Sequence, residues 1–570
     1  MTGGLAVPGS CNTFGANCTP IPLNLTNLDP RITNGLVRCG SNGVPDGCMS
    51  GHWFNPAPRI GFAFDPTGDG KMSVRAGYGI FYHHGAGNEA NTGSLEGSAP
   101  LVLDMTQNRP SSYECIGGVG ELPGGAGPCQ GKGAYPLNVT SIPTAVTWPY
   151  VQQWSFSIQR QVSKSTVATI AYVGSKGTHL ATDLQINQLA PVAPGQNPFL
   201  PGQPITLSDC SSYDGNRFAL YGTPNPITQV APVTAMVNEG QPGFVNLQAA
   251  CFGTPNTNLP DPNSLRTFAP GLGRIFSLQN VADSNYNALQ ATLRRATGPL
   301  TLGVSYSYSH SIDDSSDRSD TTLVNALDLA SNRASSSFDQ RHLLAINYIY
   351  KLDSLLDKLR LSLSNWSADS GTPAPEVESR VGHVIATGWE LSGITVYQSG
   401  TPFSVINGAS SNGTSVLDNA GVANGIGPGS YPDVIGNPRS KAPYDENSIG
   451  PALYNPAAFA APTGLTFGNI GRNFLNNPSR LNFDAALLKH FKVTEGSTLE
   501  FRAEAFNVFN HTEFIIYDPD RGNQANNTVS CYGGPNYSAG DPSCQIGSSF
   551  LHPIEAHRPR TVQFGLKFAF

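Results

Sequence analysis

Four aspartates crowd one short segment of the chain and are the first candidates for chemistry. With the serines between them they form a run of oxygen-bearing side chains, namely Asp313, Asp314, Ser315, Ser316, Asp317, Ser319 and Asp320. Oxygen-rich loops can bind calcium, but the spacing differs from that of an EF-hand loop. The sequence therefore favours a solvated polar loop over a calcium site.

Two other polar motifs have the composition of ligand sites without the required spacing. His83 and His84 are adjacent at the end of an alternating segment. Neighbours in a strand point to opposite faces, so we expect a structural or surface role rather than a shared metal. Residues 65–71 read DPTGDGK. They lack the phosphate-loop pattern and are rich in turn-forming residues, which predicts a turn.

No enzyme signature accompanies these residues. The chain contains no Gly-x-Ser-x-Gly, His-Glu-x-x-His or Gly-x-Gly-x-x-Gly motif. A secreted soluble β-rich enzyme would need a catalytic constellation and a polar outer face, and the sequence provides neither. We expect a protein that is not an enzyme and that needs no cofactor or metal.

Three charged residues near the C-terminus have the spacing of a strand. Glu500, Arg502 and Glu504 occupy every second position and would share one face. If this strand crosses a membrane, the shared face must point to a wet interior, because charges on the lipid side are costly. We predict a lumenal charge ladder, which leaves open whether it contacts a solute, a plug or only water.

The elements that would position this ladder are amphipathic strands. The last ten residues alternate without a break, and their apolar face consists of Val562, Phe564, Leu566, Phe568 and Phe570. This length suits a tilted strand that crosses a bilayer. The sequence has no run of about 18 apolar residues, and a β-barrel is the other structure that satisfies its backbone inside lipid.

Similar alternating segments recur upstream, and short and long connections alternate between them. Short turns are expected at 65–71, 163–165, 297–299 and 492–497, and long loops at 1–57, 84–149, 176–283, 310–338, 399–479 and 511–557. Outer-membrane barrels combine short periplasmic turns with longer extracellular loops. The pattern predicts about eleven crossings; only the connection 351–386 is too long for its expected periplasmic side.

Composition agrees with an all-β chain. The 62 glycines and 45 prolines argue against long helices, and charged residues make up only 13%. The formal net charge of −7, without a basic block, gives no reason to expect a nucleic-acid partner.

All cysteines fall in the loops expected to lie outside the membrane. The ten are Cys11, Cys18, Cys39, Cys48, Cys115, Cys129, Cys210, Cys251, Cys531 and Cys544. Each loop that contains cysteines holds an even number, which favours local disulfides formed in an oxidising compartment. Metal binding is the weaker alternative, because no Cys-x-x-Cys motif is present.

Several stretches together resemble one family. They are 55–64 (NPAPRIGFAF), 74–82 (VRAGYGIFY), 149–155 (PYVQQWS), 171–180 (AYVGSKGTHL), 388–394 (GWELSGI), 398–403 (QSGTPF) and 501–511 (FRAEAFNVFNH). The chain is similar to the Oar-like (OmpA-related) TonB-dependent receptors over most of its length. The resemblance implies an antiparallel transmembrane β-barrel of the bacterial outer membrane, whose final strand, 562–570, is read by the barrel-insertion machinery.

The resemblance also implies parts that the chain lacks. Full members carry a signal peptide, a TonB box and a plug inside a barrel of about 22 strands. We therefore expect residues 1–57 to be an extracellular loop region with a truncated start, and 58–570 to be the C-terminal part of a larger plugged barrel. The implied function is uptake of a small solute, glycan or peptide, with the TonB system engaged only through the missing parts. The alternative is a surface-exposed adhesive or structural barrel that transports nothing.

Overall fold

The computed structural model describes ten segments on which the fold rests. They are 54–83, 147–188, 275–320, 322–353, 387–406, 431–440, 453–460, 467–518, 550–553 and 555–570. Further described pieces are 5–7, 21–23, 50, 139–141, 143, 217–221 and 233–238. All ten cysteines and His84 lie outside the described residues, so the expected disulfides stay a prediction.

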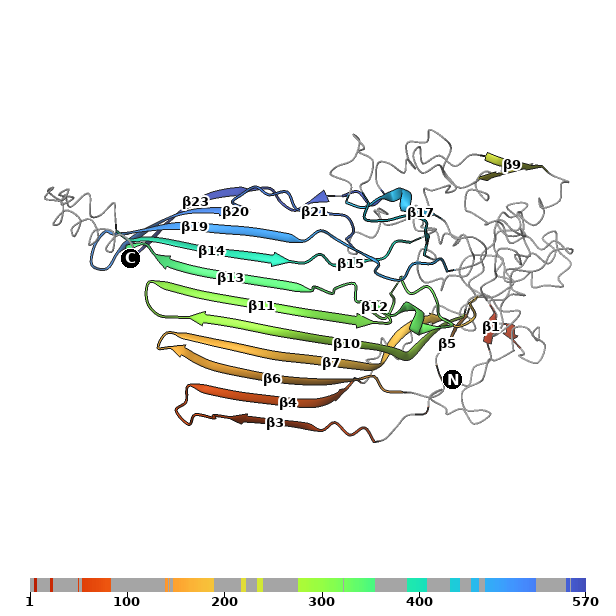
Figure 1. Ribbon diagram of the computed structural model, residues 1–570, viewed down its shortest axis with the longest axis horizontal. Coiled ribbons are helices and arrows are strands. Elements are labelled where there is room, and N and C mark those ends of the chain that lie inside the picture. The colour runs from red at the N-terminus through yellow and green to blue at the C-terminus, as the bar shows by residue number, and fades with distance from the viewer. Residues whose placement is uncertain are drawn as a thin grey trace.

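One large antiparallel sheet dominates the structure (Figure 1). Its strands, in spatial and chain order, are β3 (Arg59–Phe64), β4 (Met72–Tyr82), β6 (Tyr150–Ser163), β7 (Thr166–Gln185), β10 (Ile275–Arg295), β11 (Leu300–Asp313), β13 (His342–Lys351), β14 (Trp389–Gln398), β19 (Arg480–Lys492), β20 (Thr498–Phe506) and β23 (Thr561–Ala569). Each pairs with the next, which confirms the expected eleven crossings. Among the described strands no pairing joins β3 to β23, so the sheet is not closed.

The remaining elements are short. β5 (Val139–Ser141) pairs with β10 and β12 (Ala334–Ser335) with β11. Two-stranded pairs are formed by β1 (Leu5–Val7) with β2 (Ile21–Leu23), β8 (Arg217–Tyr221) with β9 (Val233–Asn238), β15 (Pro402–Phe403) with β18 (Leu475–Asn476), β16 (Asp433–Val434) with β17 (Phe459–Ala460), and β21 (Phe514–Ile515) with β22 (Glu555–Ala556). Two 3₁₀ turns, η5 (Leu329–Asn332) and η6 (Pro456–Ala458), complete the set. No helix among the described residues has the length and apolar character to span a membrane.

Short connections gather at one end of the sheet, here called the turn end, and most long ones at the other, the loop end (Figure 1). The long connection between β13 and β14 is the exception, because β13 ends and β14 begins at the turn end, as expected for 351–386. The predicted turn at 65–71 is confirmed. There Asp65 accepts hydrogen bonds from the backbone N–H groups of Gly70 and Thr67 at 2.8 and 3.1 Å. These bonds, with that from the Thr67 hydroxyl, hold the pKa of the Asp65 carboxyl below its ordinary value.

Two strands are longer than the sequence indicated. Residues 176–185 and 275–283, expected within one long loop, extend the β7–β10 ladder to the pair Phe276–Gln185. A register shift beside Ala282 marks where the extension begins. Apolar and polar side chains do not alternate in the extension, although Leu184 and Ile275 are nearly fully buried and Thr182 donates to the hydroxyl of Ser315.

The strand registers carry one apolar face across the whole sheet. Directly paired residues point to the same face. Following the pairs from β3 to β11 places these residues on one face: Phe62, Ala76, Phe156, Tyr172, Leu289 and Tyr308. Tyr306 shares this face with Tyr308 and pairs with Leu344, so the same face continues through Leu344, Tyr397, Leu481, Phe501 and Leu566. The opposite face, here called the polar face, carries mostly small or polar residues such as Ser157, Gln290, Ser307 and Arg502.

The apolar face is not covered by other described parts of the chain. Phe564 and Leu566 are 72% and 71% exposed, and Ile170 in the middle of the sheet is 60% exposed. A water-soluble sheet would bury such a face beneath a helix or a second sheet. This arrangement fits hydrocarbon as the surrounding solvent.

Glycines on this face make room for large rings on the neighbouring strand. A Cβ at Gly174 would collide with the indole of Trp154, its partner on β6. A Cβ at Gly393 would lie 2.6 Å from the Tyr348 hydroxyl oxygen. Ring-over-glycine pairs of this kind help to fix strand register.

Candidate functional site

Two regions hold the charged and buried groups that the described chain offers for function. The first is the polar face near the C-terminal strands, and the second is a packed assembly of connections at the loop end. Within the described residues no three His, Cys, Asp or Glu side chains gather as a metal site.

The predicted charge ladder is formed on the polar face. Arg502 donates from Nε to Glu500, and its Nη1 lies 3.8 Å from Oε1 of Glu504. His490 Nδ1 lies 3.7 Å from Oε2 of Glu500 on the neighbouring strand. Gln563 on β23 donates to Glu504, so β19, β20 and β23 all contribute to this row of polar contacts.

The ladder is partly open to the surroundings. The Arg502 side chain is 43% exposed and the Glu504 side chain 26%. A row of alternating charges that is paired yet accessible can contact water, an anionic or cationic solute, or another polar surface. Its lumenal role stays a prediction.

The terminal strand has the predicted pattern. β23 pairs with β20 along its whole length, with Phe564 opposite Ala503 and Leu566 opposite Phe501. Val562, Phe564, Leu566 and Phe568 all lie on the apolar face, and Phe570 is 99% exposed. Recognition of this terminal strand by the barrel-insertion machinery stays a prediction.

The aspartate segment differs from the expectation. A solvated loop was predicted, but Asp313 is only 2% exposed and Asp320 9%. The cause is Arg472, a fully buried residue whose guanidinium binds Asp313 and lies 2.9 Å from Oδ2 of Asp320. This cation replaces the solvent that isolated carboxylates would need.

The other two aspartates also have protein donors. Asp314 accepts from Nη1 of Arg333 at 3.0 Å and from the backbone N–H of Asp283 at 2.9 Å. Asp317 accepts from the backbone N–H of Ser319, and burial raises the pKa of its carboxyl. These contacts account for the four carboxylates without a bound cation.

Arg472 also links connecting segments of the loop end that are far apart in the sequence. Its Nε donates to the carbonyl of Asn332 at 2.9 Å and its Nη1 to the hydroxyl of Ser316 at 3.0 Å. The next residue, Asn473, donates to the carbonyl of Ser335 at 2.7 Å. The sequence gave no local sign of this role, because 399–479 contains only three basic residues and nothing in its pattern singles out Arg472.

An apolar core lies beside this ionic network, here called the loop core. Its buried members are Val324, Phe403, Val405, Ile406, Tyr431, Ala458, Phe459, Ile470, Leu475, Ile516, Phe550 and Leu551. They come from three long connections, those after β11, β14 and β20. The described parts of these three connections therefore pack together into one body.

Tyr431 ties the loop core to the aspartate segment. Its hydroxyl donates to the carbonyl of Thr322 at 2.6 Å. Burial raises the pKa of this phenol well above its ordinary value. The neutral form of Tyr431 is thus the form that the packed connections require.

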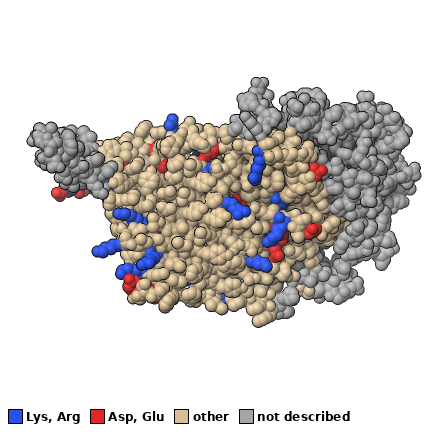
Figure 2. All heavy atoms as spheres, in the orientation of Figure 1, with Lys and Arg blue, Asp and Glu red and all other residues tan. Residues whose placement is uncertain are grey.

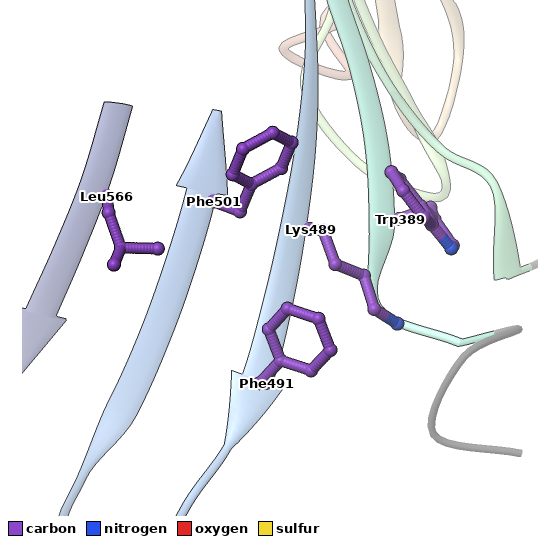
Figure 3. Close-up of a pocket in the computed structure, with 5 residues that line it drawn as sticks. All are labelled: Trp389, Lys489, Phe491, Phe501 and Leu566. Atoms are coloured by element: carbon purple, nitrogen blue, oxygen red, sulfur yellow. The ribbon is translucent and has the colours of Figure 1, made fainter. Parts of the chain in front are cut away.

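The described residues also line a groove on the apolar face, away from both regions. It has a volume of about 370 Å³ and is lined by Trp389, Lys489, Phe491, Phe501 and Leu566 (Figure 3). The Lys489 ammonium donates to the carbonyl of Thr387 and lies 5.3 and 5.0 Å from the ring centres of Trp389 and Phe491. This cation is therefore satisfied by protein groups, and the groove faces outward rather than along the polar face.

Of the histidine motif, His83 lies within the described residues. The backbone N–H of His83 donates to the carbonyl of Pro149 at 2.8 Å and extends the β4–β6 ladder by one residue. The structural or surface role expected for its side chain stays a prediction.

Comparison with known proteins gives the class. Residues 19–542 match the family model of the outer membrane beta barrel domain, and the chain belongs to this family. It is therefore an antiparallel β-barrel protein of the bacterial outer membrane, with its loop end extracellular. None of the curated proteins matches the chain.

Solved structures of outer-membrane proteins resemble the chain at low identity. One is the outer membrane transporter YddB from Escherichia coli, with 9% identity, a TM-score of 0.35, and coverage of 90% of this chain and 40% of that one. Another is the siderophore receptor PirA from Acinetobacter baumannii, with 8% identity, a TM-score of 0.34, and coverage of 90% and 41%. The chain thus spans about 40% of the length of these proteins.

Proposed function

We propose that the chain is the barrel portion of a TonB-dependent receptor of the Oar-like type and takes part in solute binding and uptake across the outer membrane. The proposal rests on the motifs that resemble this family, several of which lie in the central sheet: 74–82 lies within β4 and 501–506 within β20. TonB, a plug and the transported solute enter the proposal through that resemblance alone.

The observation that carries the proposal is the charged polar face. A barrel that only anchors a surface domain needs no charge ladder inside, whereas a solute path uses charged and polar side chains along its wall. Glu500, Arg502 and Glu504 supply such a wall, and their partial exposure leaves them able to contact a solute or a plug.

Uptake measurements in cells that encode the chain test the proposal. We expect deletion of residues 54–570 to abolish uptake of one solute in energised cells, and an uncoupler to abolish that uptake in the wild type. The variant Arg502→Gln should reduce this uptake without loss of folded barrel. Siderophores, glycans and peptides are the solute classes to screen.

A second function has support from the loop core. Connections packed into one body present a fixed outer surface, which suits adhesion to a partner. Under this alternative the deletion leaves uptake of every screened solute unchanged and instead removes cell attachment. That result would reject the transport proposal.

A further inference from the structure

The apolar face changes character near the loop end, where basic side chains replace apolar ones. Lys176 on β7 lies two residues beyond Gly174, and His310 on β11 lies two residues beyond Tyr308. Both stay on the apolar side of the sheet, because strand residues two apart share a face. Arg341 joins them, with its Nη2 3.0 Å from Nε2 of His310. These three residues are called the rim patch.

Aromatic rings lie directly below the rim patch. The His342 ring centre lies 5.1 Å from that of Tyr308 and 6.2 Å from that of Tyr306. The Tyr306 hydroxyl and His342 Nδ1 are 2.9 Å apart. Rings of this kind mark the interfacial level of outer-membrane barrels. The rim patch therefore lies at the height of the lipid headgroups.

A buried carboxylate orients the rim patch without neutralising its positive charge at the surface. Asp339 accepts from the backbone N–H of Ser311 at 2.8 Å, and its Oδ2 lies 3.1 Å from Nε of Arg341 and 3.0 Å from Nδ1 of His310. The Asp339 side chain is 2% exposed, whereas that of Arg341 is 44% exposed. The surface that meets the surroundings is thus the guanidinium and not the carboxylate.

Lys176 supplies a second cation at a distance that suits one polar headgroup. It is exposed, and the register places it two strands across and two residues along from His310, about 12 Å between Cα atoms from standard strand spacings. Long basic side chains at both ends of this span can converge on one anionic group between them. In Figure 2 blue spheres lie toward both the left and the right of the coloured surface, with a mostly tan stretch between them.

We propose that the rim patch binds the phosphate of a lipid headgroup in the outer leaflet of the outer membrane. The apolar face below it is in contact with acyl chains, so a ligand at this height is continuous with the membrane. Arginine and lysine are the side chains that bind phosphate most strongly, and amide groups of Asn285 and Asn287 lie on the same face beside them. This site is separate from the proposed solute path on the polar face.

Native mass spectrometry of the purified full chain tests the site. The probe is diphosphorylated lipid A added to detergent micelles, compared with the same lipid after enzymatic removal of its phosphates. The double variant Lys176→Gln/Arg341→Gln is compared with Arg160→Gln, an exposed arginine on the same face at the turn end. A heat-dependent mobility shift on electrophoresis confirms a folded barrel in each sample.

The expected result is a loss of about 25-fold in bound lipid A for the double variant, at roughly fivefold for each basic residue. Arg160→Gln should bind as the wild type does, and removing the phosphates should lower wild-type binding by at least fivefold. A loss below fivefold in the double variant, or equal binding of the phosphate-free lipid by the wild type, overturns the proposal. The phosphate comparison uses the wild type alone, so it decides the matter even if the double variant does not fold.

Discussion

Replacing Arg472 by Met should release the packed connections at the loop end while the sheet stays folded. Met matches the length of the arginine stem but leaves Asp313 and Asp320 buried without their cation. Removing one partner of a buried ion pair costs about 3–5 kcal/mol. The side chain of Arg472 is completely buried and those of its two partners nearly so, which places this network in the buried class.

That cost converts to an increase of roughly 10² to 10⁴ in the equilibrium constant for local opening, at about 1.4 kcal/mol per tenfold. The effect should stay local, because the strand ladders do not run through Arg472. Hydrogen exchange of the variant should therefore speed up in 314–335 and 467–477 and remain slow in β11 and β19.

The triple variant Arg472→Met/Asp313→Asn/Asp320→Asn is the matched control, since it removes the charges together. It should recover a large part of the lost protection. If Arg472→Met alone leaves exchange in 314–335 within threefold of the wild type, the reasoning about the buried network is refuted.

Three further predictions concern the sheet, the loop core and the terminal strand. Gly174→Val should lower the yield of folded barrel in a heat-shift assay, because the valine side chain would collide with the Trp154 indole. The additional change Trp154→Ala should restore the yield. Failure of the double variant to recover would count against the ring-over-glycine pairing. The folded-state pKa of Tyr431 is raised, so the stability that its neutral phenol contributes is full below the ordinary pKa of 10.0 and is lost as pH rises beyond that value. Proteolysis of the extracellular connections should therefore increase above about pH 10 in the wild type. A proteolysis rate that stays unchanged up to pH 12 would contradict this. Leu566→Asp should reduce membrane insertion strongly and Gly565→Asp, on the polar face, much less, as measured by the folded fraction in isolated outer membranes; equal losses would argue against the assignment of faces.

Much of the sheet could be predicted from the sequence because alternation is a local signal. The segment 561–570 contains its full pattern within ten residues, and the turn 65–71 contains its own hydrogen-bonding groups. The same logic placed Glu500, Arg502 and Glu504 on one face, since strand geometry alone fixes that relation. These features depend on neighbours within a few positions.

The loop end could not be predicted in this way because its order comes from distant contacts. Arg472 lies more than 150 positions from Asp313, and no periodicity relates them. The aspartate segment therefore looked solvated when read alone. The extension of β7 and β10 was missed for a related reason: Leu184 and Ile275 are nearly fully buried and Thr182 donates to the hydroxyl of Ser315, so contacts with distant residues accompany the pairing there.

Site-directed spin labelling along β11 tests most directly whether the apolar face meets lipid and the polar face meets water. Labels at Leu302 and Val304 lie on the apolar face, and labels at Thr301 and Ser305 on the polar face. In reconstituted membranes, oxygen should relax the first pair more strongly, and a water-soluble nickel chelate the second pair, with a period of two residues. Accessibility that does not alternate, or nickel access that is greater at Leu302 and Val304, would contradict the membrane-spanning sheet described above.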